Sequence, residues 1–148
     1  MRSRSTAGMT LMELLLVVVI IGILTAAILP RIARSREART AKSAASVIGG
    51  DVEAAFSAAA RSRHPMLFRC NCTSYQYEVA DQVDGSIRQT RRLDSTTNLM
   101  VDRLTFSSTS IVIGPNGIAS AAFEIGVGVG SSSRRIAVSR TGQVRIIQ

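Results

Sequence analysis

Hydrophobic residues are concentrated near the start of the 148-residue chain and are spaced out over the remainder. From Leu14 to Leu29 there is no charged residue, whereas further on short apolar runs alternate with Ser, Thr, Gly and Arg. The 21 residues from Met9 to Leu29 would form a helix of about 31 Å at ~1.5 Å per residue, which is enough to span a bilayer core of ~30 Å. The pattern therefore predicts one membrane-spanning helix.

The residues around this apolar run distinguish a retained anchor from a removable secretory signal. Arg2 and Arg4 precede the run, as basic residues do in signal peptides, but no small-x-small cleavage site follows it. The run is followed instead by Pro30 and then by four arginines, which are Arg31, Arg34, Arg36 and Arg39. We therefore expect an anchor that stays in the membrane. Arginines flank both of its ends, so charge alone leaves its orientation open.

Glu13 is an acidic residue close to the beginning of the apolar run. A carboxylate in hydrocarbon is unfavourable by several kcal/mol unless it is neutralised. Two interpretations stay open on this ground. Either Glu13 lies at the level of the lipid headgroups and is tolerated there, or it has a partner and a function.

The residues after Pro30 remain compatible with a helix as far as His64–Pro65, which should end it. Apolar side chains recur there at helical spacing and should pack on a sheet of the same protein; they are Ile48, Val52, Ala55, Phe56 and Ala59. Gly49–Gly50 interrupts the helical pattern, so that either a kinked helix or two shorter helices fit.

Beyond Pro65 the pattern changes to short apolar runs separated by turn residues, which is typical of β-strands. We expect strands within residues 66–71, 74–80, 99–107, 108–114, 118–129, 134–140 and 143–148. Residues 88–98 are polar and are expected to form a loop. A long N-terminal helix followed by strands in this order predicts an α+β fold, with the helix packed on one small antiparallel β-sheet.

Composition restricts the function. The chain is 46% hydrophobic but only 4% aromatic, and its formal net charge is +8. All basic residues except Lys42 are arginines, which permits phosphate lipids, nucleic acid or acidic proteins as partners without choosing among them. One His, few acidic residues and no obvious ligand cluster make an enzyme improbable, and we expect no metal and no cofactor.

The N-terminal residues resemble the leader and first helix of type IV prepilins. The resemblance is carried by the string Gly8-Met9-Thr10-Leu11-Met12-Glu13, by the unbroken aliphatic stretch after it and by Pro30, 22 residues after Gly8. It implies that a prepilin peptidase cuts between Gly8 and Met9 on the cytoplasmic side and methylates the new amine of Met9. Phe is the usual first mature residue, and Met9 is a variation that minor members show.

The same resemblance assigns roles to two residues of the helix. Cleavage would place Glu13 at position five of the mature chain and Pro30 at position 22. Glu13 could then neutralise the α-ammonium of Met9 on a neighbouring subunit, and the two charges meet only when subunits stack in register. Pro30 removes one helical hydrogen bond and is expected to kink the helix or melt it locally.

The end of the chain resembles the C-terminal domain of the GspH/FimT group, which comprises the minor pseudopilin H of type II secretion and FimT-like minor pilins. Phe106, an Ile-Val-Ile strand, the turn Pro115-Asn116-Gly117 and a final hairpin turning at Gly142 carry this resemblance. The expected organisation is a prepilin leader at 1–8, a transmembrane and assembly helix at 9–30, an amphipathic helix continuation at 31–64 and an extracytoplasmic β domain at 65–148.

Three smaller motifs favour structural roles. A disulfide within Cys70-Asn71-Cys72 would be strained on a strand, so small packing residues or an exposed thiol are favoured, with oxidation left open outside the cytoplasm. Gly126, Gly128 and Gly130 have no helix after them, which fits a thin strand or bulge better than a nucleotide loop. His64 has no acid within local reach and is interpreted as a surface turn residue.

Arginines around the final hairpin form a candidate DNA-binding group, because each neutralised phosphate adds affinity; they are Arg134, Arg135, Arg140 and Arg145. In FimT-like pilins that take up DNA, a C-terminal Gly-Arg-x-Arg sequence carries the binding. Here the sequence is Gly142-Gln143-Val144-Arg145, which lacks the first of these arginines. A solvated basic face is the favoured alternative.

The sequence thus predicts a non-enzymatic minor subunit of a filament. Its expected function is that of pseudopilin H in a type II secretion pseudopilus, and the alternative is a FimT-like minor type IV pilin in pilus biogenesis or DNA uptake. The implied partners are prepilin peptidase, other pilins or pseudopilins and the membrane, with DNA less favoured. The expected location is the bacterial inner membrane, crossed once, with the C-terminal domain in the periplasm or outside the cell.

Overall fold

The computed structural model describes residues 10–147 of the chain, except for the side chains of Ala27 and Pro30. One helix, α1 (Leu11–Ser62), accounts for 52 residues. Thr10 caps its start, because the backbone N–H of Glu13 donates to Thr10 Oγ1 at 3.2 Å. By their internal contacts the residues form two compact units, with the boundary between Ser35 and Arg36.

The helix passes through Gly49 and Gly50 without interruption, so the expectation of two shorter helices is wrong. Tertiary packing outweighs the low helix propensity of glycine here. A Cβ atom on Gly49 would lie 3.2 Å from a methyl group of Val144, tighter than ordinary van der Waals contact. The small residue therefore lets the helix approach the last strand closely. The helix also continues through Pro30, so the expectation of local melting there is wrong, whereas the kink stays a prediction.

Eight strands follow the helix within the described residues. They are β1 (Met66–Asn71), β2 (Gln76–Asp81), β3 (Ile87–Arg92), β4 (Arg103–Phe106), β5 (Ser110–Ile113), β6 (Phe123–Val129), β7 (Ser132–Val138) and β8 (Val144–Ile147). A short 3-10 helix, η1 (Cys72–Ser74), follows β1. The α+β class and the long N-terminal helix are confirmed. The strands, however, form two antiparallel four-stranded sheets instead of one, in the orders β3-β2-β1-β5 and β4-β6-β7-β8.

Strand β3 lies where the sequence predicted a loop. Its polar residues pair with β2 from Gln76↔Arg92 to Ala80↔Ile87, with a register shift on the way. It is an edge strand with largely exposed side chains, a position at which Arg and Gln are well tolerated. The alternating apolar pattern that signals a strand is absent because little of β3 is buried, and for this reason sequence patterning missed it.

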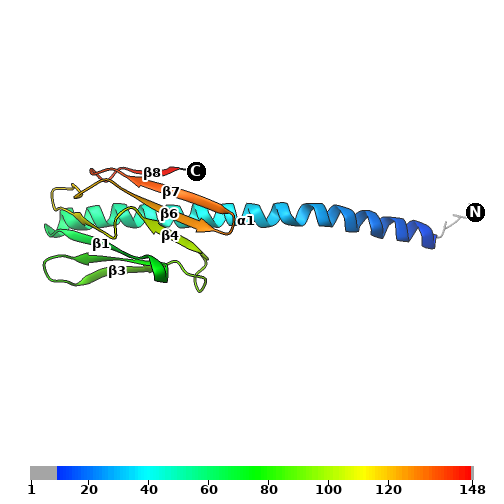
Figure 1. Cartoon of the computed structure of the whole chain (residues 1–148), viewed down its shortest axis with the longest axis horizontal. Helices are drawn as coiled ribbons and strands as arrows, with labels where there is room; N and C mark the ends of the chain where they lie inside the picture. The colour runs from blue at the N-terminus through cyan, green and yellow to red at the C-terminus, as the bar shows by residue number, and fades with distance from the viewer. Residues whose placement is uncertain (1–9, 148) are drawn as a thin grey trace, which may run out of the picture. The chain divides into compact units, whose positions relative to one another are not determined.

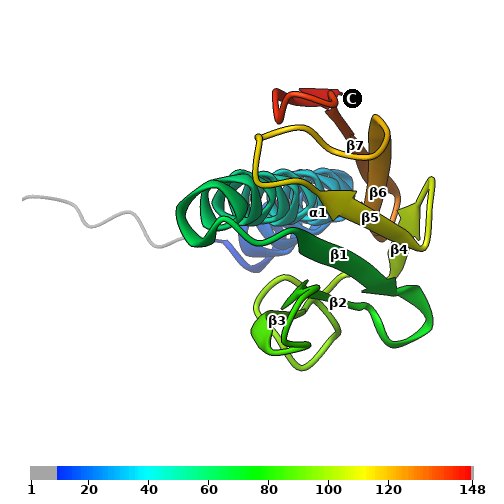
Figure 2. The ribbon, with the colours of Figure 1, turned by 90° about the vertical axis from the view of Figure 1, so that its left-hand side faces the viewer.

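The predicted apolar stripe of α1 is the helical side of the core. Its five members, Ile48, Val52, Ala55, Phe56 and Ala59, are all buried. Both sheets lie along this part of the helix, and Figure 2 shows their strands curving around it (Figures 1 and 2). Aromatic side chains from both sheets meet in the core, with the Phe68 ring stacked 5.1 Å from Tyr77 and 5.8 Å from Phe106 between centroids.

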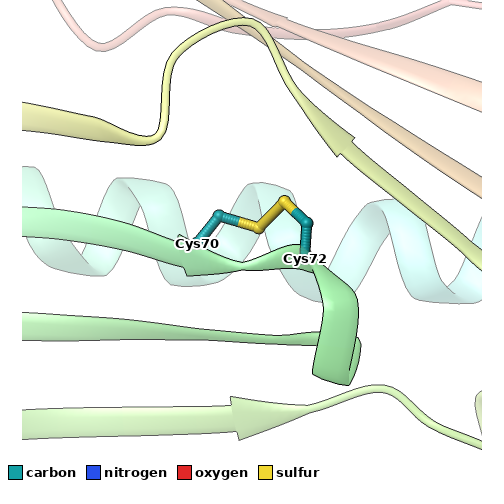
Figure 3. The surroundings of a disulfide bond; sticks show 2 residues. All are labelled: Cys70 and Cys72. Atoms are coloured by element: carbon teal, nitrogen blue, oxygen red, sulfur yellow. A yellow bond between two sulfur atoms is a disulfide. The ribbon is translucent and has the colours of Figure 1, made fainter.

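Cys70 and Cys72 form a disulfide, contrary to the favoured expectation of two unlinked thiols (Figure 3). That expectation placed both residues on one extended strand. The strand instead ends at Asn71, and Cys72 begins η1, so that the two Cα atoms lie 5.2 Å apart. This separation is within the range that disulfides adopt. The turn at the end of β1 therefore brings Cys70 and Cys72 close enough to form the disulfide.

Candidate filament-forming and anion-binding surfaces

The N-terminal part of α1 is an uncovered apolar helix. Among the described residues α1 is the one helix long and apolar enough to cross a membrane, with a mean hydropathy of 2.8 in its most apolar window. The large apolar side chains from Leu11 to Leu29 are between 41% and 82% exposed. An apolar surface of this size needs lipid or other helices around it. It fits a single-pass membrane anchor.

Glu13 lies in the first turn of this helix, and its side chain is exposed. The ion pairs within residues 10–147 do not include it. Its carboxylate is therefore available to a group from outside the chain. Gly8 and Met9, the expected cleavage and methylation site, lie outside the described residues.

A polar cluster fixes the β6–β7 turn to the helix. Glu37 of α1 accepts hydrogen bonds from the backbone N–H and the hydroxyl of Ser131, at 2.9 Å and 2.7 Å. Asp102 accepts the N–H of Gly130 at 2.6 Å, and Arg103 donates to the Gly130 carbonyl oxygen at 2.6 Å. Gly130 has a φ of +56°, and a Cβ atom there would lie 2.5 Å from the Glu37 carboxyl carbon. The positive φ favours glycine at this turn, and a side chain there would displace the end of the Glu37 side chain.

A buried carboxylate joins the helix to the other sheet. Asp51 accepts two hydrogen bonds from Arg91 of β3, at 2.8 Å and 2.9 Å, and one from the hydroxyl of Tyr77 at 2.5 Å. Burial acts to raise the pKa of Asp51, but the hydrogen bonds from Arg91 and Tyr77 outweigh it, and the net pKa lies below its ordinary value. Burial and the neighbouring Asp51 raise the pKa of Tyr77. Asp51 is therefore ionised and fully paired, a structural role that the sequence did not reveal.

His64 has an acidic partner after all. Its Nδ1 lies 3.0 Å from Oδ2 of Asp81, which also accepts a hydrogen bond from Arg88 at 3.0 Å. Asp81 is almost completely buried and accepts the Val83 N–H as well. Burial acts to raise the pKa of Asp81, but these hydrogen bonds hold it well below its ordinary range. His64 lies in the partly exposed bend after α1, as expected of a turn residue. Its acidic partner was not predicted because Asp81 is 17 residues away in sequence and is brought to it by β2.

The structure divides the four predicted DNA-binding arginines among three places. Arg134 and Arg135 of β7 line a shallow hollow of about 230 Å³ together with Arg103 of β4. Arg145 of β8 lines a second hollow, which shares no lining residue with the first. The Arg140 guanidinium donates instead to the carbonyl oxygen of Ala119, at 3.3 Å. The sequence did not predict that Arg103 joins Arg134 and Arg135, because β4 precedes the final hairpin by some thirty residues.

Two glycines of β6 shape this hollow. A Cβ on Gly126 would meet the Thr105 hydroxyl, and one on Gly128 would lie 3.0 Å from the Arg103 guanidinium. The glycines therefore let side chains of β4 lie flat across the strand, in agreement with the expected thin strand. Arg135 is partly neutralised by Glu124 at 3.7 Å, and Arg103 by Asp102 at 3.5 Å. The hollow can hold an anion, but with reduced charge.

Comparisons with known proteins agree with this architecture. The family model described as Type II transport protein GspH matches residues 44–142. The type IV minor pilin FimU of Pseudomonas aeruginosa has a similar structure, with 13% identity over 72% of this chain and 92% of FimU, and a TM-score of 0.56. The minor pseudopilin EpsH of the Vibrio cholerae type 2 secretion system has 16% identity over 72% of this chain and 95% of EpsH, with a TM-score of 0.54. No curated protein matches the sequence.

Proposed function

The chain belongs to the GspH family of type II transport proteins, and from this we propose that it is a minor pseudopilin of a type II secretion pseudopilus. The family and fold are those of structural subunits of pilin type. The observation that carries the proposal is the uncovered apolar part of α1 in a chain of this family. Glu13 lies in the first turn of this helix and takes part in no ion pair within residues 10–147.

We propose further that the chain is made as a precursor that a prepilin peptidase cuts between Gly8 and Met9 and methylates at Met9. In the filament Glu13 pairs with the Met9 ammonium of a neighbouring subunit. The pair is favourable only when both charges meet, since each alone is costly in an apolar helix bundle. Before assembly the chain crosses the inner membrane once, and its folded unit lies on the extracytoplasmic side.

One genetic experiment distinguishes a function in secretion from a function in DNA uptake. In a strain of the source bacterium that lacks this chain, we expect loss of exoprotein secretion, restored by the wild-type chain, with unchanged natural transformation. Loss of transformation with normal secretion would contradict the secretion proposal. A Gly8→Val variant should fail to restore secretion and should accumulate as precursor, because the peptidase needs the small residue.

A DNA-binding minor pilin is the second candidate, favoured by the hollow between Arg103, Arg134 and Arg135. Phosphate neutralisation without base contacts predicts sequence-independent binding whose log affinity falls with log salt by roughly 0.9 per contacted phosphate on duplex DNA. Arg135→Ala should reduce this slope by about one, whereas Arg140→Ala should leave it unchanged because Arg140 lies apart. Mobility shifts at about 50 and 200 mM salt measure the slope, and no shift by the wild type at low salt would eliminate this candidate.

A further inference from the structure

Four strands lie at the edges of the two sheets, and they differ in what protects their free backbone groups. Strand β5 is bordered by the chain itself, since the Ser120 N–H donates to the Val112 carbonyl oxygen at 2.7 Å. Strand β4 lies beside η1. The edge of β3 is free, but half of its six residues are arginines, and charged side chains on an edge hinder the addition of another strand. Strand β8 remains to be considered.

Strand β8 is an aliphatic edge strand with one charge. Three of its four residues are Val or Ile, and the side chains of Ile146 and Ile147 are 42% and 40% exposed. In the sheet order of the described residues no strand lies beyond β8, and both ribbon views show it at the outside of its sheet (Figures 1 and 2). A shallow hollow of about 590 Å³ runs along β7 and β8, with Val144, Arg145 and Ile147 in its lining. An open aliphatic edge of this kind favours strand addition.

The backbone groups of Val144 and Ile146 point away from β7. Where the β7–β8 hairpin begins, the Ser139 N–H donates to the Gln143 carbonyl oxygen at 3.0 Å, so these two residues form a hydrogen-bonded pair. Hydrogen-bonded and non-hydrogen-bonded pairs alternate along two antiparallel strands. In this register Arg145 is bonded to β7, whereas Val144 and Ile146 are not. Their N–H and carbonyl groups therefore face the open edge.

Arg145 determines the chemistry of a strand that would fit this edge. Its side chain is exposed and takes part in no ion pair within residues 10–147. An antiparallel strand bonded to Val144 and Ile146 would place one residue opposite Arg145 in a non-hydrogen-bonded pair, where side chains lie closest. Glu or Asp at that position would pair with the guanidinium, whereas a second copy of β8 in this register would place Arg145 opposite Arg145, which is destabilising.

We propose that the edge of β8 binds an extended segment of another polypeptide by antiparallel strand addition, and that this segment carries an acidic residue between two aliphatic residues. The backbone of Val144 and Ile146 holds the segment, and Arg145 selects the acidic residue. The aliphatic residues project on the same face of the sheet as Ile146 and cover its exposed side chain. Strand addition at β8 involves the folded unit alone, so it holds whether or not the chain acts in secretion.

The test uses the isotope-labelled full chain in detergent micelles and the capped peptide Thr-Ile-Glu-Val-Thr as the probe. Hydrogen exchange followed by NMR measures the protection of single backbone amides. We expect the outward amides of Val144 and Ile146 to exchange at least about tenfold more slowly at saturating peptide. The same peptide with N-methyl groups on its Ile and Val amides should bind at least about tenfold more weakly, because it cannot donate two backbone hydrogen bonds. Thr-Ile-Lys-Val-Thr should also bind more weakly, because its Lys lies opposite Arg145.

A pair of proline variants tests the edge from the side of the chain. Ile146→Pro removes an outward N–H without removing a bond to β7, a position at which edge strands tolerate proline, and it should weaken binding of the Glu peptide at least about tenfold. Thr90→Pro is the matched control on the edge of β3. The Leu93 N–H donates to the Tyr75 carbonyl oxygen at 2.9 Å, so by the same alternation the Thr90 N–H also points outward. Thr90→Pro should bind the peptide like the wild type.

Three results would overturn strand addition by an acidic segment. The first is that the Glu peptide protects no amide of β8. The second is that the N-methylated peptide or the Lys peptide binds as strongly as the Glu peptide, which also decides the matter if Ile146→Pro fails to fold. The third is that the amides of Val144 and Ile146 are protected without peptide, increasingly at higher protein concentration, because a second copy of the chain would then occupy the edge. None of these results bears on secretion, cleavage or filament assembly.

Discussion

Two stretches of α1 carry apolar residues in different patterns, and they differ in what covers them. From Leu11 to Leu29 the apolar residues run without a period, and the large apolar side chains among them are exposed. From Ala41 to Ala59 they recur at helical spacing, and the repeating positions are buried under two sheets. The periodic apolar stripe is thus buried by the chain's own sheets. The unbroken apolar run can be buried only by lipid or by other subunits.

The two stretches of the helix also differ in whether their carboxylates are paired. Asp51 lies in the covered stretch and is bound by Arg91 and Tyr77. Glu13 lies in the uncovered stretch, and the ion pairs of residues 10–147 leave it out. A charge placed in an apolar setting needs a partner, and for Glu13 we propose the Met9 ammonium of a neighbouring subunit. Asp51 is thus satisfied by folding of the chain, whereas the proposed partner of Glu13 becomes available on assembly.

The largest expected effect is on assembly. Glu13→Ala should insert and be processed normally, because loss of a charge makes the span more apolar, but it should be nearly absent from filaments, because the Met9 ammonium of the neighbour loses its partner. The measurement is the amount of each variant in sheared filaments relative to the membrane. Glu53→Ala, which removes an exposed carboxylate from the covered stretch of α1, should assemble like the wild type. Normal incorporation of Glu13→Ala would mean that Glu13 is only tolerated.

Asp51 should matter for folding and not for assembly contacts. Asp51→Ala leaves the Arg91 guanidinium and the Tyr77 hydroxyl without their acceptor, and we expect a loss of about 3 kcal/mol in the free energy of unfolding. Tyr77→Phe keeps the ion pair and should cost about 1 kcal/mol. Urea unfolding of the chain in detergent, followed by circular dichroism, measures both. A cost of Asp51→Ala no larger than that of Glu53→Ala would show that the network does not hold the sheet to the helix.

The contact with Glu37 should determine how much a side chain at position 130 lowers the free energy of unfolding. Gly130→Ala must adopt φ +56° and displace the Glu37 carboxylate, so we expect a loss of about 2–3 kcal/mol. Gly117→Ala is the matched control, since its φ is +72° but nothing lies within 4 Å, and it should cost only about 1 kcal/mol. In a Glu37→Ala background the cost of Gly130→Ala should fall toward that of the control. An unchanged cost would exclude Glu37 as the cause.

The smallest effect is the pH dependence. The pKa values of Asp51 and Asp81 are both lowered in the folded chain, so the unfolded chain binds more protons below about pH 4. Stability is therefore complete above this pH and declines as the pH falls toward about 2. Asp81→Asn should make the decline shallower in urea unfolding at pH 7, 4 and 3. A decline as steep as that of the wild type would show that Asp81 does not contribute.

Periodicity and local motifs were enough to predict the α+β class, the buried stripe from Ile48 to Ala59 and most strands. In most cases they failed where the determining contact is distant in sequence. Strand β3 is held by pairing with β2 and by the bond from Arg91 to Asp51, 40 residues away. Arg103 joins Arg135 only through the sheet order, and Glu37 meets Ser131 across 94 residues. The Cys70–Cys72 bond depended on a local turn that the strand pattern did not signal.

The chain is a pilin-type subunit, and the apolar part of its helix is buried by lipid or by other subunits. Intact-mass analysis of the protein isolated from membranes of its source bacterium tests this most directly. We expect a chain that begins at Met9 and carries one additional methyl group on its N-terminal amine. A chain that keeps residues 1–8, or one cut after the apolar run, would contradict the account.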